Sequence, residues 1–218
     1  MRTACIKGSG AEYPIGKIVC LARNYVEHIR ELGNETPDKP VLFMKPASSV
    51  IGDGGVISIP AFSRECHHEV ELALLIGKKG KDIAEEEALG HVAGYGVALD
   101  MTLRDVQNEL KRKGLPWEIA KGFDTSCPLS DFAPAQLVAD PQALRLRLEI
   151  NGELRQNGTT DHMIYPVRQI VSYVSSIFTL EPGDVILTGT PSGVGPVRSG
   201  DRLQAELAGL VTLGVTVA

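Results

Sequence analysis

The stretch HHEVELALLIGK, residues 67–78, predicts a buried β-strand that carries two carboxylates. From Val70 to Ile76 its residues are apolar except Glu71, and a Gly-Lys-Lys-Gly turn ends the run. Because side chains alternate faces along a strand, Glu69 and Glu71 should point the same way, about 7 Å apart. Two acids beside an apolar sheet lose hydration and repel each other unless a positive charge compensates them. The segment therefore predicts either a divalent-cation site or an edge strand with a wet, acidic outer face.

A third acid, Asp100, ends another buried-strand pattern over residues 91–99. An all-oxygen set of Glu69, Glu71 and Asp100 suits a hard cation, magnesium, manganese or calcium, rather than zinc or copper. Three protein oxygens leave about half of an octahedral shell open to water or substrate, as in catalytic sites. His67 should lie on the same strand face as Glu69. It is either a fourth ligand, which would make zinc a candidate, or a histidine with a structural role.

The composition favours one domain of an ordinary globular protein: 218 residues, 43% hydrophobic and 22% charged. A net charge of −5 without a basic cluster argues against a nucleic-acid partner. The sequence has no signal-peptide core and no run of about 18 apolar residues, so we expect no membrane span. Its four cysteines lie far apart, without a Cys-x-x-Cys pair. This pattern predicts reduced thiols in a cytoplasmic protein.

Short strand patterns dominate the rest of the chain. Asn151-Gly152 is a strong hairpin signal after a run of strict alternation, with a partner strand that should reach about Gln156. Residues 1–16 are punctuated by glycine and proline and are expected to form a loop-like N-terminal extension. Further strands are expected over residues 17–22, 41–46, 56–60, 144–150, 185–188, 202–207 and 211–217. With about three helices, the predicted class is a β-rich α+β fold.

Three helices are predicted. The first covers residues 26–33, with Val26, Ile29 and Leu32 at helical spacing. In the second, Thr102 should be the N-cap in a capping box with Asp105, and the helix should run to glycine 114. The third should begin at proline 166 and continue to about residue 178.

The helix over residues 26–33 brings His28 and Glu31 together as i,i+3 neighbours, close enough to hydrogen-bond. It has only about two turns, too few for stability without tertiary support, and could order and disorder as a lid. The glycine-rich stretch over residues 189–195 lacks the Gly-Lys-Ser/Thr ending of a nucleotide P-loop. It could present Thr190 and backbone N–H groups to a carboxylate, or it is a hairpin connection. Lys121 taken by itself would be interpreted as a surface lysine.

Several unlinked motifs, in this order, resemble those of the fumarylacetoacetate hydrolase family, and most closely its short, single-domain branch of acylpyruvases and oxaloacetate decarboxylases. The similarity spans roughly residues 17 to 213. The motifs are Arg-Asn-Tyr at 23–25 with His28-x-x-Glu31, Phe-Met-Lys-Pro at 43–46, His-Glu-Val-Glu-Leu at 68–72, Leu-Asp-Met-Thr-x-Arg-Asp-Val-Gln at 99–107, Gly-Leu-Pro-Trp at 114–117, Lys121, Asn-Gly-Glu at 151–153 and Leu-Thr-Gly-Thr-Pro-x-Gly-Val-Gly at 187–195.

The resemblance implies a mixed β-sandwich roll with a catalytic domain over residues 17–218, usually a homodimer. It implies Mg²⁺ or Mn²⁺, with Ca²⁺ as a substitute, at the three acids Glu69, Glu71 and Asp100. It further implies that His28 and Glu31 form a catalytic dyad on a lid, with Lys121 adding positive charge at the reacting oxygens. The substrate contacts that it implies, besides Lys121, are Arg23, Gln107 and Thr190.

A small 2-keto acid fits this chemistry, because a cation at the acids would stabilise the enolate formed during reaction. We expect first a hydrolase acting on C–C bonds of acylpyruvates such as acetylpyruvate or fumarylpyruvate, or a decarboxylase of oxaloacetate. Oxaloacetate keto–enol tautomerase or 5-carboxymethyl-2-hydroxymuconate-type isomerase activity is the second expectation. A non-enzymatic β-rich protein with a structural calcium ion is a third interpretation.

Overall fold

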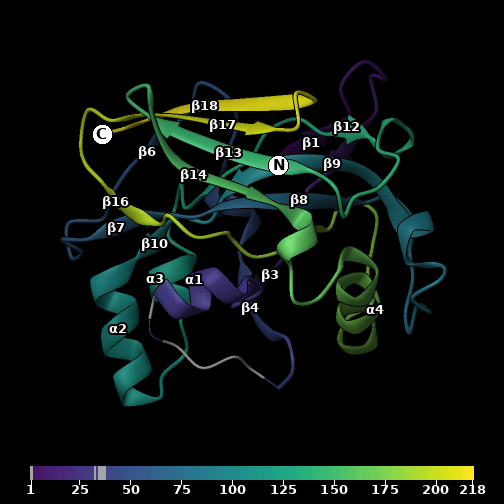
Figure 1. The fold of residues 1–218 in the computed structure, drawn as a ribbon, viewed down its shortest axis with the longest axis horizontal. Helices are drawn as coiled ribbons and strands as arrows, with labels where there is room; N and C mark the ends of the chain where they lie inside the picture. The colour runs from purple at the N-terminus through teal and green to yellow at the C-terminus, as the bar shows by residue number, and fades with distance from the viewer. Residues whose placement is uncertain (1, 32, 34–37) are drawn as a thin grey trace.

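The computed structural model describes residues 2–31, 33 and 38–218. Its centre is a mixed six-stranded sheet, which packs under a second sheet of five strands (Figure 1). The strands of the central sheet, in spatial order, are β12 (Ala133–Pro134), β9 (Val92–Leu99), β8 (Val70–Ile76), β15 (Val185–Leu187), β3 (Ile18–Ala22) and β4 (Val41–Lys45).

Strand β8 lies in the interior of this sheet, and every one of its residues is buried. It pairs antiparallel with β9 on one side, where Leu72 lies opposite Val97, and with β15 on the other, where Leu74 lies opposite Ile186. The interpretation of this segment as a wet edge strand is therefore wrong. The strand expected over residues 67–78 is also interrupted at Glu69, which separates β8 from the short strand β7 (Cys66–His68).

The second sheet is formed by β14 (Glu153–Thr159), β13 (Arg145–Ile150), β17 (Arg202–Leu207), β18 (Val211–Val217) and β6 (Val56–Ile57). Buried and more exposed residues alternate along β13 and β18, as expected for a sheet with one face on the core. Its inward residues, including Leu148 and Leu213, share one apolar cluster with Leu72 and Val97 of the central sheet. The β-rich α+β class with a sandwich core is confirmed.

The hairpin between β13 and β14 turns at Asn151 and Gly152, whose φ angles of 54° and 82° are those that such a tight turn requires. The hairpin prediction is therefore confirmed, although β14 continues beyond Gln156 to Thr159. Residues 1–16 contain an antiparallel pair, β1 (Thr3–Cys5) with β2 (Glu12–Pro14), so the loop-like expectation for this segment is wrong.

The described residues form four α-helices: α1 (Val26–Glu31), α2 (Arg104–Lys113), α3 (Glu118–Lys121) and α4 (Val167–Ile177). Three match predicted helices, and α3 is additional. In Figure 1, α1, α2 and α3 gather below one end of the sheets, while α4 lies at the other end. Leu32, which was expected to continue the first helix, lies outside the described residues.

Helix α2 ends as predicted, because Gly114 takes the left-handed conformation with φ 65°. Its start differs from the prediction: Leu103 is the N-cap and makes no side-chain capping bond. Thr102 belongs to the short strand β10 (Thr102–Leu103), and its hydroxyl donates to the backbone oxygen of Asp100 at 3.1 Å. The predicted capping box is therefore wrong, since pairing with β7 holds Thr102 outside the helix.

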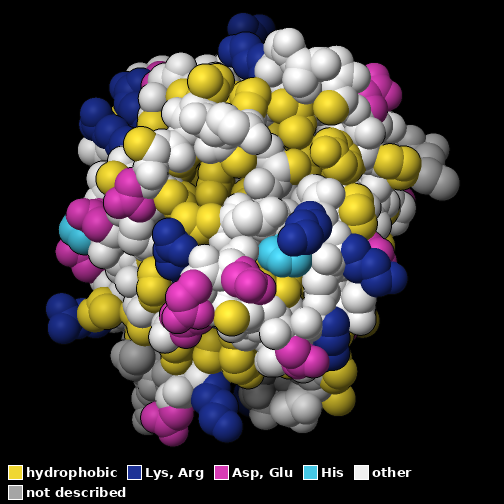
Figure 2. All heavy atoms as spheres, turned by 90° about the vertical axis from the view of Figure 1, so that its right-hand side faces the viewer, with side chains coloured by type: hydrophobic (Ala, Val, Ile, Leu, Met, Phe, Trp, Pro, Cys, Tyr) yellow, Lys and Arg dark blue, Asp and Glu magenta, His cyan; other side chains and the backbone are white. Residues whose placement is uncertain are grey.

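Two smaller sheets complete the fold: β10, β7 and β16 (Gly195–Val197) form one, and β11 (Cys127–Pro128) with β5 (Val50–Ile51) forms the other. Short 3₁₀ segments are η1 (Ala47–Ser49), η2 (Ala88–His91), η3 (Ala135–Leu137) and η4 (Thr160–His162). All four cysteines are free thiols, as predicted. None of the described helices is both long and apolar enough to cross a bilayer. On the face shown in Figure 2, acidic and basic side chains are interspersed among apolar ones.

The contribution of β8 to the stability of the fold can be tested at Leu74, in the middle of the strand. The Leu74 side chain is fully buried, so Leu74→Ala should lower the free energy of unfolding by about 3 kcal/mol through lost apolar burial and the cavity left behind. Leu137, which is 67% exposed, provides the control. Leu137→Ala should change the free energy of unfolding by less than about 0.5 kcal/mol. Urea denaturation of both variants measures the difference, and equal effects would contradict the burial of β8.

Candidate active site

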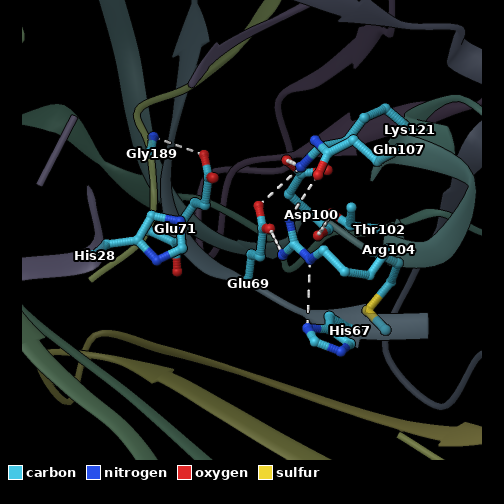
Figure 3. Close-up of polar contacts among 12 residues, drawn as sticks. His28, His67, Glu69, Glu71, Asp100, Thr102, Arg104, Gln107, Lys121 and Gly189 are labelled. Carbon is cyan, nitrogen blue, oxygen red and sulfur yellow. Dashed lines mark hydrogen bonds and ion pairs between the residues drawn. The ribbon is translucent and has the colours of Figure 1, made fainter. Parts of the chain in front are cut away.

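Three acids meet where strand β8 begins and its antiparallel neighbour β9 ends. Val70 lies opposite Leu99 in the antiparallel pair, and the Asp100 N–H donates to the Glu69 backbone oxygen at 2.8 Å. Glu69, Glu71 and Asp100 are all buried, with one carboxylate oxygen of each within 4.8 Å of the others (Figure 3). The structure thus brings together the three acids that the sequence singles out.

Positive side chains surround two of these acids. Lys121 Nζ lies 2.8 Å from Glu69 Oε2 and 2.5 Å from Asp100 Oδ2, and Arg104 also pairs with Glu69. Lys45 Nζ lies 2.8 Å from Asp100 Oδ1. Lys121 is only 3% exposed, so its interpretation as a surface lysine is wrong. Although burial opposes it, the charges of Lys121 and Arg104 hold the pKa of Glu69 well below its usual range.

Glu71 has a different environment. It accepts a hydrogen bond from the Gly189 N–H at 2.7 Å, and no cation in the described part of the chain forms an ion pair with it. Burial, followed by the charges of Asp100 and Glu69, raises the pKa of Glu71 well above its usual range. Glu71 is therefore the acid of the group whose ionised form the protein stabilises least. A hard divalent cation fits this donor set, because it prefers carboxylate oxygens and would stabilise the ionised form of Glu71.

His67 lies beside the group but does not belong to it. Its Nε2 lies 2.9 Å from Glu65 Oε1, and its Nδ1 lies 3.4 Å from Arg104 Nε. Both ring nitrogens thus have partners other than the three acids, and Figure 3 shows the contact with Arg104. The interpretation of His67 as a fourth ligand is wrong, because the ring is held by its neighbours on the outer side of Arg104.

Helix α1 contributes His28 and Glu31. His28 Nδ1 lies 3.4 Å from Glu31 Oε2, and the Glu31 carboxylate also accepts from the Gly193 N–H at 3.1 and 3.2 Å. The second contact fastens α1 to the glycine-rich loop over residues 189–195. Burial lowers the pKa of His28, although Glu69 and Glu31 act in the opposite direction. The buried imidazole is therefore neutral near neutral pH and can accept a proton.

One cavity joins these groups. Its volume is about 30 Å³, and its lining combines the acids, the cations beside them and His28. Arg23 follows β3 in a left-handed conformation with φ 61°, a strained geometry for a residue with a side chain. The lining residues are Leu21, Ala22, Arg23, His28, Phe43, Glu69, Glu71, Asp100, Arg104, Gln107, Lys111, Trp117, Lys121 and Thr190. Of the residues predicted for the site, only Glu31 lies outside this lining.

Two buried polar residues escape the sequence-based reasoning. Gln156 accepts from the Val70 N–H at 3.0 Å and donates to Thr190 Oγ1 at 2.8 Å, so it ties β8 to the glycine-rich loop. Gln156 lies in β14, whose residues are mostly exposed, so nothing in the sequence indicates that this glutamine is buried. Lys45 is the second: it is a buried charge at the end of the otherwise apolar strand β4, and that contrast is the signal in the sequence that could reveal it.

Comparisons with known proteins agree with this geometry. The chain matches the Fumarylacetoacetate (FAA) hydrolase C-terminal family model over residues 17–218. It is 52% identical over 196 residues to "Oxaloacetate tautomerase FAHD1, mitochondrial" of Mus musculus, which covers 90% of this chain and 89% of that protein. It is 50% identical over 204 residues to "Oxaloacetate tautomerase YcgM" of Escherichia coli (strain K12), which covers 93% of each.

Among solved structures, the fold is similar to that of fumarylpyruvate hydrolase from Pseudomonas aeruginosa in complex with Mn²⁺ and pyruvate. The TM-score is 0.95 and the identity 40%, covering 100% of this chain and 95% of that one. The match to the family model and the identity to these relatives each extend over nearly the whole chain. The protein is a member of the fumarylacetoacetate hydrolase family.

Proposed function

We propose that this protein is a divalent-metal enzyme that interconverts the keto and enol forms of oxaloacetate. The sequence predicts this activity second, after hydrolysis or decarboxylation. Relatives named oxaloacetate tautomerase, at 50 and 52% identity over most of the chain, now favour it. The structural observation that carries the proposal is a buried, neutral His28 in the same cavity as three buried acids. Tautomerisation needs those two parts and no water.

Glu69, Glu71 and Asp100 would hold the Mg²⁺ or Mn²⁺. When bound, the cation would supply Lewis-acid stabilisation of negative charge on the oxygens of the keto acid. The Gly189 N–H bond orients Glu71, and Lys45 orients Asp100, so the ligand oxygens are positioned before substrate arrives.

His28 would move the proton. With Nδ1 bonded to Glu31, its Nε2 is available to take a proton from C3 of the keto form, and Glu31 would stabilise the imidazolium that results. Although burial opposes it, Asp100 and Glu69 raise the pKa of Lys121, which stays an ammonium and can donate to the developing enolate oxygen. One proton leaves carbon and one joins oxygen, so the two forms differ only in the position of a proton. Arg23, Gln107 and Thr190 would contact the substrate.

Hydrolysis of an acylpyruvate is the second candidate. It is favoured by the similarity to the fumarylpyruvate hydrolase structure, whose complex contains Mn²⁺ and pyruvate. The His28–Glu31 pair could then activate a water molecule at the distal carbonyl, as a general base. The homodimer, the cytoplasmic location and the domain boundary at residue 17 stay predictions.

The tautomerase proposal is tested by adding oxaloacetate in its enol form to protein with Mg²⁺ and following loss of enol absorbance. We expect the enol to decay well above its rate in buffer. His28→Gln should lower kcat by about 10²–10⁴-fold because the base is lost. His162→Gln, on an exposed histidine, should leave the rate unchanged. Release of CO₂ and pyruvate is followed in parallel. Enol decay no faster than in buffer, with metal bound, would refute tautomerisation.

The pH dependence follows from the lowered pKa of His28. Because the neutral imidazole is the base, kcat/KM should be lost only as pH falls through the lowered pKa, below the usual value of about 6.5. Glu31 raises this pKa, so Glu31→Gln should move the acidic limb to still lower pH. A pH–rate profile of both proteins measures it. An acidic limb above the usual histidine value would contradict the role of His28.

The metal site is tested without activity, by titrating Mn²⁺ into the apo-protein and counting free Mn²⁺ by electron paramagnetic resonance. Glu71→Gln should weaken Mn²⁺ binding at least about tenfold, since it removes the charge that lacks a cation partner. Glu85→Gln, at an exposed position outside the cavity, is the matched control and should bind as the unaltered protein does. Equal Mn²⁺ affinity in both variants would exclude Glu71 as a ligand.

A further inference from the structure

We propose that Lys111 binds the distal carboxylate of a dicarboxylic 2-keto acid, and so makes this enzyme prefer such substrates over keto acids with an uncharged end. The inference rests on the proposed function and names the residue that sets its substrate class. The sequence motifs described above assign Lys111 no role.

Helix α2 places Lys111 at the cavity. Arg104, Gln107 and Lys111 follow one another at three- and four-residue spacing and therefore share one helical face. Arg104 Nη1 donates to Gln107 Oε1 at 2.7 Å, and both side chains are buried. Lys111 lines the same cavity but is only partly buried. The face thus runs from the buried acids toward solvent and ends in an ammonium group.

This ammonium lacks an anionic partner. No carboxylate in the described part of the chain forms an ion pair with Lys111, whereas Lys113 on the same helix pairs with Glu109 at 2.6 Å. Lys111 Nζ lies instead 5.3 Å from the centre of the Trp117 ring. Burial, followed by the charges of Arg104 and Arg23, lowers the pKa of Lys111 to about 8. A carboxylate placed here would relieve repulsion among like charges.

Three other cations of the site are already engaged by the acids, and Arg23 is a further substrate contact in the proposed function. Lys121 and Arg104 pair with Glu69, and Lys45 pairs with Asp100. In the proposed reaction the 2-keto carboxylate lies at the acids and their cation, so a second carboxylate needs a positive group farther out.

The wall next to Lys111 suits the carbon chain between two carboxylates. Phe43 and Trp117 both line the cavity, with ring centres 6.2 Å apart, and form an apolar surface that leads from the acids to the ammonium. A keto acid that ends in a methyl group would contact these two rings but would leave Lys111 without an anion. The geometry therefore favours a dianion such as oxaloacetate over pyruvate-like monoanions.

The test uses two ligands that share the 2-keto acid head and differ in the distal carboxylate. At pH 7 with Mg²⁺, KM and kcat for oxaloacetate and the competitive inhibition constant of pyruvate are measured for unaltered protein and Lys111→Met. We expect KM for oxaloacetate to rise about tenfold or more, as for a lost charge-assisted hydrogen bond, with kcat little changed. The inhibition constant of pyruvate should change less than about twofold.

Two controls separate this role from a structural one. Lys111→Arg keeps the charge and should keep most of the preference, while Lys113→Met on the same helix should change neither constant. If Lys111 only supported Trp117, its loss would shift oxaloacetate and pyruvate equally, and that result would overturn the inference. An unchanged KM for oxaloacetate would do the same. Absence of oxaloacetate turnover in the unaltered protein would instead refute the proposed function.

Discussion

The burial of three carboxylates at one place is the constraint on which the site depends. Antiparallel pairing of β8 with β9 brings Glu69, Glu71 and Asp100 together, and their mutual repulsion has to be offset. Lys121, Arg104 and Lys45 offset the charge of two acids, but Glu71 has only a backbone N–H. A divalent cation would attract all three carboxylates and so offset their repulsion. Its binding would stabilise the folded chain, and more so the higher its affinity.

Contacts around the acids hold the glycine-rich loop and helix α1 in position beside them. Gln156 joins β8 to the glycine-rich loop, and Glu31 joins that same loop to α1 through the Gly193 N–H. His28, the proposed base, is thus held beside the acids through contacts between short elements.

Much of this arrangement follows from local rules. Strand alternation and a strand end predict the grouping of Glu69, Glu71 and Asp100, and helical spacing predicts the contact of His28 with Glu31. The features that local rules miss depend on partners far away in the chain. Thr102 is not a helix cap because β7 pairs with it, and His67 is not a ligand because Glu65 and Arg104 hold its ring. The burial of Lys121 and the bridging by Gln156 likewise arise only when distant strands and loops meet.

Glu69, Glu71 and Asp100 are proposed to bind one hard cation together. This binding is tested most directly by anomalous X-ray diffraction from crystals of the protein grown with Mn²⁺. We predict one strong anomalous peak per chain in bonding contact with all three carboxylates. A peak at another position, or no peak while Lys121 still bridges Glu69 and Asp100, would contradict this proposal.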